Sequence, residues 1–181
     1  EFRFDATGRR IAEVVNGVVT LRVAFDGAHS WADYNTASEA ETRYLFSNNI
    51  DQIVAAHRST ESLVWYNSDK LGTVRDMSNA VGFVGPQVVY SVFGIIETGL
   101  VGNEWNRFAF TGREYQQAAN LLSYRSRYLS SSQGQFISQD SFRFEAGDPN
   151  LYRYVSNSTQ NYSDPTGGFA IGEYSGATIP A

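Results

Sequence analysis

Hydrophobic and polar residues alternate along much of the first sixty positions, and short polar segments interrupt the alternation. The longest alternating stretch covers residues 18–25, where one side is formed by Val19, Leu21, Val23 and Phe25. Successive side chains of a β-strand point to opposite faces, so a period of two is typical of a strand with one buried face. The pattern therefore predicts a chain built from short strands.

Turn residues separate these strands. Residues 1–10 read as a strand followed by a glycine turn, and the return strand continues to Val15. Asn16 and Gly17 then form the strongest short hairpin signal, because both residues tolerate the positive φ of a type I′ turn. The beginning of the chain is therefore predicted to be a series of hairpins.

The same reading extends through most of the chain. Further strands are predicted, with polar turns between them, at 32–34, 42–46, 52–58, 121–128 and 135–138. Short strands at such spacing are typical of an all-β array. One short helix is the exception, since Asp148 suits a helix cap, Pro149 suits the first helical position and residues 151–155 continue the pattern.

Composition supports a folded β protein. Hydrophobic residues make up 42% and charged residues 18% of the 181 positions, with 11 Tyr and 12 Phe, which excludes intrinsic disorder and favours strands. The net charge of −5 argues against a general nucleic-acid-binding surface. Arginines do alternate with tyrosines between Arg113 and Tyr154, as on single-stranded nucleic-acid platforms. In an acidic chain, arginine stacking on tyrosine within strands explains the alternation better.

Five motifs occur in a fixed order in the last third of the chain. They are residues 110–115 (FTGREY), 124–128 (YRSRY), 134–140 (GQFISQD), 148–155 (DPNLYRYV) and 164–167 (DPTG). In this order they resemble the Rhs-associated core, the C-terminal end of the shell in the YD-repeat (rearrangement hotspot) family. Residues 1–10 also resemble a YD repeat, with Phe at both aromatic positions.

The resemblance implies a division of the chain into a YD-repeat hairpin region at 1–106, an Rhs-associated core at 107–167 and a C-terminal tail at 168–181. It further implies a spiral β-shell that encapsulates and presents a C-terminal polypeptide such as a toxin. The expected partners are the remainder of the shell, the C-terminal toxin and components of a delivery machine. The implied location is secreted or at a bacterial cell surface.

The sharpest chemistry lies at Asp140 and Asp164. In the family that the chain resembles, the aspartates of two Asp-Pro-x-Gly motifs form an aspartic-protease-like pair that cuts the chain just after the second motif, here after Gly167. Two carboxylates that share a proton divide the base and acid roles of such a cleavage. The second motif is intact, whereas residues 140–143 (DSFR) lack both Pro and Gly, and Gln135 replaces the usual Arg. Structural turn aspartates are the alternative interpretation.

Other chemistry has little support in the sequence. His29 and His57 are isolated and the chain has no cysteine, so no metal site is predicted, and no motif indicates a cofactor. A third class of function, a surface adhesin or carbohydrate-binding module, would use exposed tryptophans such as Trp31, Trp65 and Trp105.

Association with other chains is expected from the beginning of the sequence. Glu1 falls inside a repeat, so the chain is interpreted as a fragment or a processed piece. A spiral that begins there exposes the backbone edge of its first strand, which favours self-association or pairing with the rest of the shell. No apolar run of transmembrane length occurs.

Overall fold

A computed structural model describes residues 1–59, 63–99, 106–117, 119–168 and 170–172. In these residues the chain is built from sixteen short strands and three single-turn 3₁₀ helices. This confirms the predicted all-β fold class. None of the described helices is long and apolar enough to cross a membrane.

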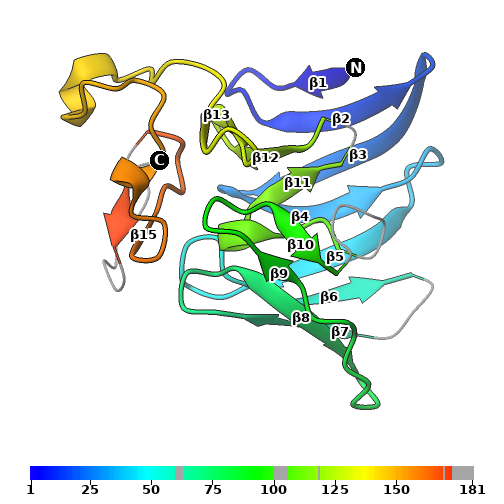
Figure 1. Ribbon diagram of the computed structural model, residues 1–181. Helices are drawn as coiled ribbons and strands as arrows, with labels where there is room; N and C mark the ends of the chain where they lie inside the picture. The colour runs from blue at the N-terminus through cyan, green and yellow to red at the C-terminus, as the bar shows by residue number, and fades with distance from the viewer. Residues whose placement is uncertain (60–62, 100–105, 118, 169, 173–181) are drawn as a thin grey trace.

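An eight-stranded antiparallel sheet forms the larger part of the molecule (Figure 1). Its strands are β1 (Phe2–Phe4), β2 (Arg10–Val15), β3 (Val18–Asp26), β4 (His29–Tyr34), β5 (Ala40–Phe46), β6 (Ile53–Arg58), β7 (Val64–Ser68) and β8 (Val74–Asn79). Their order across the sheet is their order along the chain, so each strand pairs with its sequence neighbours. The array of hairpins is therefore confirmed.

The turns explain where the strands end. Asn16 and Gly17 have φ values of 51° and 79°, as the predicted type I′ turn between β2 and β3 requires. The strand predicted over 121–128 is instead a hairpin, because Arg125 has a φ of 58° and reverses the chain. Period-two alternation continues through a tight turn, so the pattern alone does not reveal this reversal.

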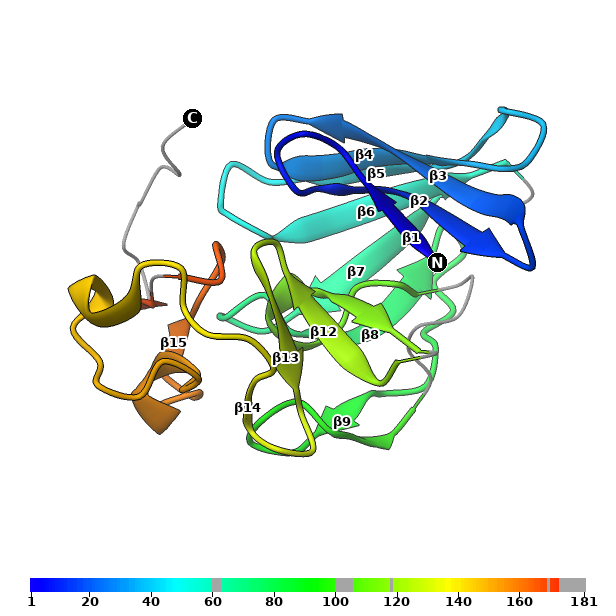
Figure 2. The same cartoon turned by 90° about the horizontal axis from the view of Figure 1, so that it is seen from above.

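Three smaller sheets follow the large one. Their strands are β9 (Val89–Tyr90), β10 (Ile96–Thr98), β11 (Glu114–Gln116), β12 (Leu121–Tyr124), β13 (Arg127–Ser130), β14 (Gln135–Phe136), β15 (Tyr162–Ser163) and β16 (Ile171–Gly172). Strands β11 to β14 form one sheet, whereas β9–β10 and β15–β16 form two-stranded pairs. In Figure 2 the large sheet curves over β12 and β13, and the segment that carries β15 lies to one side.

Two buried clusters make up the core. Beneath the large sheet, Phe108 packs edge-on against Tyr44, Phe46 and Tyr66, with ring centroids 5.1, 5.6 and 6.3 Å apart. A second cluster centres on the fully buried Tyr124, Phe136 and Tyr154 of the part of the chain that follows. Because Phe108 follows the large sheet in sequence and lies within its core, it anchors the later sheets to it.

The helix predicted after Asp148 is wrong. Asp148 accepts a hydrogen bond from the Asn150 amide at 2.8 Å, but the backbone then turns instead of continuing as a helix. The Tyr152 carbonyl accepts from Phe136 N, and Arg153 forms a β-bridge with Gln135. Pairing with β14 therefore uses the backbone groups that a helix would need.

Buried ion pairs join the large sheet to the strands that follow it. Arg107 contacts Asp33 of β4 at 2.6 Å and Glu114 of β11 at 3.5 Å. Arg10 of β2 contacts the other oxygen of Glu114 at 2.6 Å. Burial alone would raise the pKa of Glu114, but Arg107 and Arg10 outweigh it and lower the pKa to about 2.

This shift predicts a loss of stability in acid. The folded pKa of Glu114 lies below its ordinary value of 4.5, so its contribution is present above that value and is lost as the pH falls toward about 2. We expect the free energy of urea unfolding to fall less steeply over this window in Glu114→Gln than in the wild type. Glu41→Gln, which removes an exposed carboxylate from β5, is the control. Equal slopes in Glu114→Gln and the wild type would contradict the prediction.

Candidate functional site

The structure brings Asp140 and Asp164 to the same guanidinium group. Arg127 Nη2 lies 2.9 Å from Asp140 Oδ2 and 3.3 Å from Asp164 Oδ2. All three side chains are buried. Two carboxylates separated by 24 positions in sequence are thus held within reach of one nitrogen, in a water-poor setting where charges interact strongly.

Asp164 organises the loop that follows it. Its Oδ1 accepts hydrogen bonds from Thr166 N at 3.2 Å, Gly167 N at 2.9 Å and Gly168 N at 3.0 Å. The Thr166 hydroxyl donates to the same oxygen at 3.2 Å. An aspartate that binds the amides just after itself is typical of a tight turn. The intact Asp-Pro-Thr-Gly motif therefore forms a turn closed on its own carboxylate.

The peptide bond between Gly167 and Gly168 is held from both sides. Its carbonyl oxygen accepts a hydrogen bond from Arg127 Nε and lies 3.0 Å from the Ser126 hydroxyl. Its N–H donates to Asp164 Oδ1. Donors on a carbonyl oxygen polarise it and would stabilise negative charge that develops there.

Only glycine fits at position 167. The residue has a φ of 75°, and a Cβ there would lie 2.3 Å from the carbonyl oxygen of Tyr124 and 2.7 Å from the Ser126 hydroxyl. Such a contact requires the loop to move. The glycine of the motif is therefore needed for the close approach of this peptide bond to Ser126 and Arg127.

The degenerate first motif also forms a turn. Asp140 Oδ1 accepts from the Phe142 amide at 2.9 Å, and the Asp140 carbonyl accepts from Arg143 N at 3.1 Å. Arg143 occupies the position of the missing glycine and has a φ of 50°, in the left-handed region that favours glycine. The substitutions thus leave the aspartate in contact with Arg127, at the cost of local strain.

Arg127 is fixed by contacts other than the aspartates. Its guanidinium carbon lies 3.6 Å from the centroid of the Phe136 ring, and its Nη1 donates to the Leu151 carbonyl at 3.2 Å. Burial lowers the pKa of Arg127, and Asp140 and Asp164 oppose that shift. Arginine keeps its charge in such settings, so the group remains a cation between the two carboxylates.

Sequence reasoning missed Arg127 and Ser126. The arginine was expected to stack on tyrosine within a strand, whereas its ring partner is Phe136 and its polar partners are in the candidate site. One signal could have found it, because two buried carboxylates require a neighbouring cation. Nothing in the sequence distinguishes Arg127 from the other arginines nearby.

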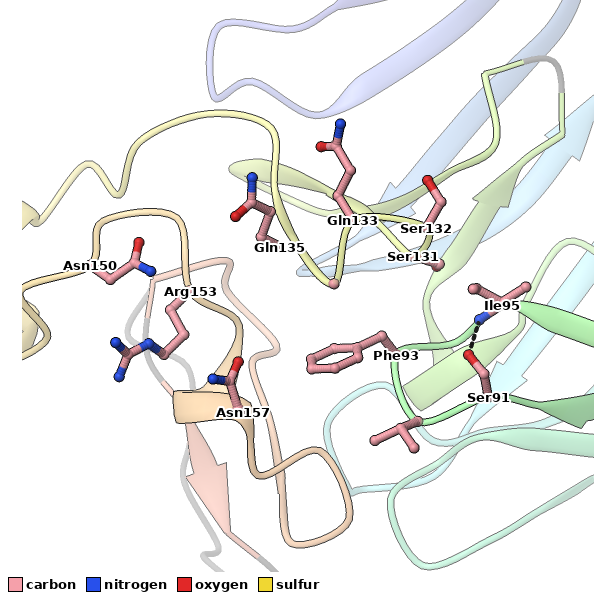
Figure 3. A pocket seen from close by; sticks show the side chains of 12 residues that line it. Ser91, Phe93, Ile95, Ser131, Ser132, Gln133, Gln135, Asn150, Arg153 and Asn157 are labelled. Atoms are coloured by element: carbon pink, nitrogen blue, oxygen red, sulfur yellow. Dashed lines mark hydrogen bonds between the residues drawn. The ribbon is translucent and has the colours of Figure 1, made fainter.

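A separate pocket of about 780 Å³ lies between the β9–β10 turn, the β13–β14 turn and the segment 150–157 (Figure 3). Its walls are mostly hydroxyl and amide side chains, with Phe93 packed on Gly134. Gln135, which stands where the family that the chain resembles has an arginine, belongs to this wall. Neither Asp140 nor Asp164 lines the pocket, so it is distinct from the candidate site.

The remaining candidate residues are dispersed. His29 stacks on Phe46 with ring centroids 4.4 Å apart, and His57 is exposed on β6. The described residues contain no group of three or more potential metal ligands. Trp31 and Trp65 are partly exposed, on β4 and β7, and are not among the pocket residues. Trp105 lies outside the described residues.

Comparison with known proteins finds distant relatives. No protein-family model matches the chain. The chain is 24% identical over 171 residues to the tRNA3(Ser)-specific nuclease WapA of Bacillus spizizenii and to the tRNA(Glu)-specific nuclease WapA of Bacillus subtilis subsp. natto. Each alignment covers 92% of this chain and 7% of the relative. The chain thus corresponds to a small part of these proteins.

Solved structures match the fold over nearly the whole chain. The TcdB2–TccC3 complex carrying TEV matches with a TM-score of 0.67 at 18% identity, over 92% of this chain and 9% of that chain. The Tc holotoxin pore of Photorhabdus luminescens matches with a TM-score of 0.66 at 18% identity, over 92% and 8%. The chain therefore shares the fold of a short segment of these Tc toxin proteins, in agreement with its resemblance to the YD-repeat family.

Proposed function

We propose that this chain is the C-terminal end of a YD-repeat β-shell, which houses or presents the polypeptide that follows it. The observation that carries the proposal is the extent of the structural match. It covers 92% of this chain, hairpin array and later sheets together, and only 9% of the TcdB2–TccC3 chain. The chain thus matches a small part of a much longer protein, as expected for one end of a shell.

Two further features support this role. Strand β1 pairs only with β2 in the described sheet, so its other edge is available for a preceding hairpin. One of the matching structures is TcdB2–TccC3 without its hypervariable C-terminal region, which matches over 92% of this chain. By analogy, the tail at 168–181 leads into a variable passenger, and the division at residues 106 and 167 separates array, core and passenger.

The shell predicts protection of the passenger. In the full protein that contains this chain, we expect the polypeptide after residue 181 to resist protease while the shell is folded, and to be digested after mild urea opens it. A passenger digested at the same rate with and without urea would contradict the shell.

The isolated chain should self-associate through the edge of β1, and light scattering would detect the oligomers. An isolated monomer that is stable to dilution would contradict this expectation.

A second candidate function is a single self-cleavage between Gly167 and Gly168. The specific observation in its favour is the geometry of this peptide bond. Its carbonyl faces Arg127 and Ser126, its N–H faces Asp164, and Asp140 shares Arg127 with Asp164. These groups surround one particular peptide bond, which supports the proposal that this bond is the one hydrolysed.

Four side chains would share the steps of this hydrolysis. Asp140 removes a proton from a water molecule, whose oxygen attacks the Gly167 carbonyl carbon. Arg127 and Ser126 stabilise the negative charge on the carbonyl oxygen. Asp164, beside the leaving nitrogen, is the protonated member of the pair in this step and gives its proton to the Gly168 nitrogen as the C–N bond breaks, while Asp140 keeps the proton taken from water. The products are a Gly167 carboxylate and a free Gly168 amine.

A further inference from the structure

A second ion cluster connects the large sheet to the loop of Asp164. At its centre is Asp51, in the turn between β5 and β6. Its Oδ2 lies 2.6 Å from Arg113 Nη1, and its Oδ1 accepts from Arg125 Nη2 at 2.6 Å. Arg125 Nη1 also donates to Oδ2 at 3.1 Å, which makes that pair bidentate. Bidentate pairs fix the orientation of a guanidinium as well as its position.

Both arginines also contact the cleavage loop. Arg125 Nη1 donates to the carbonyl oxygen of Pro165, and Arg113 Nη1 lies 3.5 Å from the same oxygen. A third contact, from Arg125 Nη2 to the carbonyl of Ala28 at 3.3 Å, extends the cluster to the β3–β4 turn. The backbone immediately after Asp164 is therefore held by two side chains that both pair with Asp51. Arg113 Nε also donates to the Ser123 carbonyl at 2.8 Å.

The burial of this cluster makes its charges depend strongly on one another. Asp51 is only 7% exposed, as is Arg113. Burial would raise the pKa of Asp51, but Arg113 and Arg125 outweigh it and lower the pKa. Loss of one charge from a buried set leaves the others without compensation, so they move or admit water.

We propose that Asp51 is a positioning residue for the cleavage loop, and that the self-cleavage site assembles only when the β5–β6 hairpin of the array has docked on the core. The inference rests on the self-cleavage proposed above. Asp51 touches none of the reacting atoms, and it acts through Arg113 and Arg125 on Pro165. Cleavage would then report that the array has folded, since a chain with an undocked sheet lacks the cluster.

The test compares Asp51→Asn with Asp69→Asn. Asp69 is a matched control, because it also occupies a hairpin turn of the large sheet, between β7 and β8, and pairs with both Nε and Nη2 of Arg75, at 3.0 and 2.8 Å. We expect Asp51→Asn to slow cleavage at least about tenfold. In an Asp140→Asn background, in which the Gly167–Gly168 bond is expected to stay intact, Asp51→Asn should also speed hydrogen exchange at the Gly167 and Gly168 amides by a similar factor. Exchange at Ala56 of β6 measures global opening and should change much less.

Each outcome decides one claim. If the wild type never cleaves, self-cleavage fails, and the exchange data alone decide the positioning role. If the wild type cleaves and Asp51→Asn matches it in rate and exchange, the positioning role is wrong and self-cleavage survives. If Asp51→Asn does not fold, Arg125→Lys keeps the charge but loses the bidentate contact, and the same local increase in exchange is expected. If hydrogen exchange at the Ala56 and Gly168 amides speeds up equally, Asp51 stabilises the whole fold and does not position the loop.

Discussion

Asp164→Asn is expected to leave the chain intact under conditions in which the wild type separates after Gly167. The amide cannot supply a proton to the Gly168 nitrogen, and the two-carboxylate division of labour is lost. Asp140→Asn should have the same effect, because the attacking water then has no base. Each change should lower the cleavage rate at least about a hundredfold. The measurement is intact mass over time, which detects a fragment that ends at Gly167.

A third aspartate provides the control for this experiment. Asp148 forms a turn of the same kind with the Asn150 amide, and its ion-pair partner is Arg153, at 3.6 Å, so Asp148→Asn should cleave at the wild-type rate. Persistent cleavage in Asp140→Asn would contradict catalysis by the aspartate pair. A wild-type chain that stays whole would favour the alternative, in which both residues serve only as turn aspartates.

Gly112→Ala is expected to destabilise the fold more than any other single methyl addition discussed above. Gly112 has a φ of 68°, and a Cβ there would lie 2.1 Å from the carbonyl oxygen of Asp51. This contact lies where the β5–β6 turn meets the core, and the three nearest atoms are backbone atoms of Asp51 and Gly72. Overpacking together with the left-handed conformation should cost at least about 3 kcal/mol. The free energy of urea unfolding measures the loss.

The matched control is Gly8→Ala. Gly8 has a φ of 81° and nothing within 4 Å of its added Cβ. This change therefore carries the backbone strain without the collision, and should cost about 1 kcal/mol. If the free energy of unfolding falls equally in both variants, the collision of the added Cβ with the Asp51 carbonyl oxygen adds nothing to the cost of Gly112→Ala.

Local sequence patterns predicted the hairpin array well. A hairpin between neighbouring strands needs only alternation and a turn, and both are visible at Asn16 and Gly17. The helix after Asp148 was wrong because its competitor is not local: β14 takes the hydrogen-bonding groups of Tyr152 and Arg153. A capping signal indicates what a segment can form alone, and does not indicate which partner it will meet.

The sequence pointed to the two carboxylates of the candidate site and not to the cations around them. Asp164 stands out because its motif is complete, and the intact turn agrees with that reading. Arg127 and Arg125 differ by two positions, yet one reaches the aspartate pair and the other reaches Asp51. The two side chains have different partners because the chain reverses at Arg125. The alternation of hydrophobic and polar residues over 121–128 does not reveal this reversal.

The strand order of the large sheet determines how such a protein can change in length. Because β1 to β8 follow one another across the sheet, no contact between the first and last strands has to close. Duplication of a hairpin ahead of β1 would leave the contacts of Arg10 and Asp33 with the later sheets unchanged. Each added antiparallel strand reverses the direction of the chain. The chain therefore enters β1 in the same direction only when an even number of strands has been added. The natural unit of growth or loss is therefore the two-stranded hairpin.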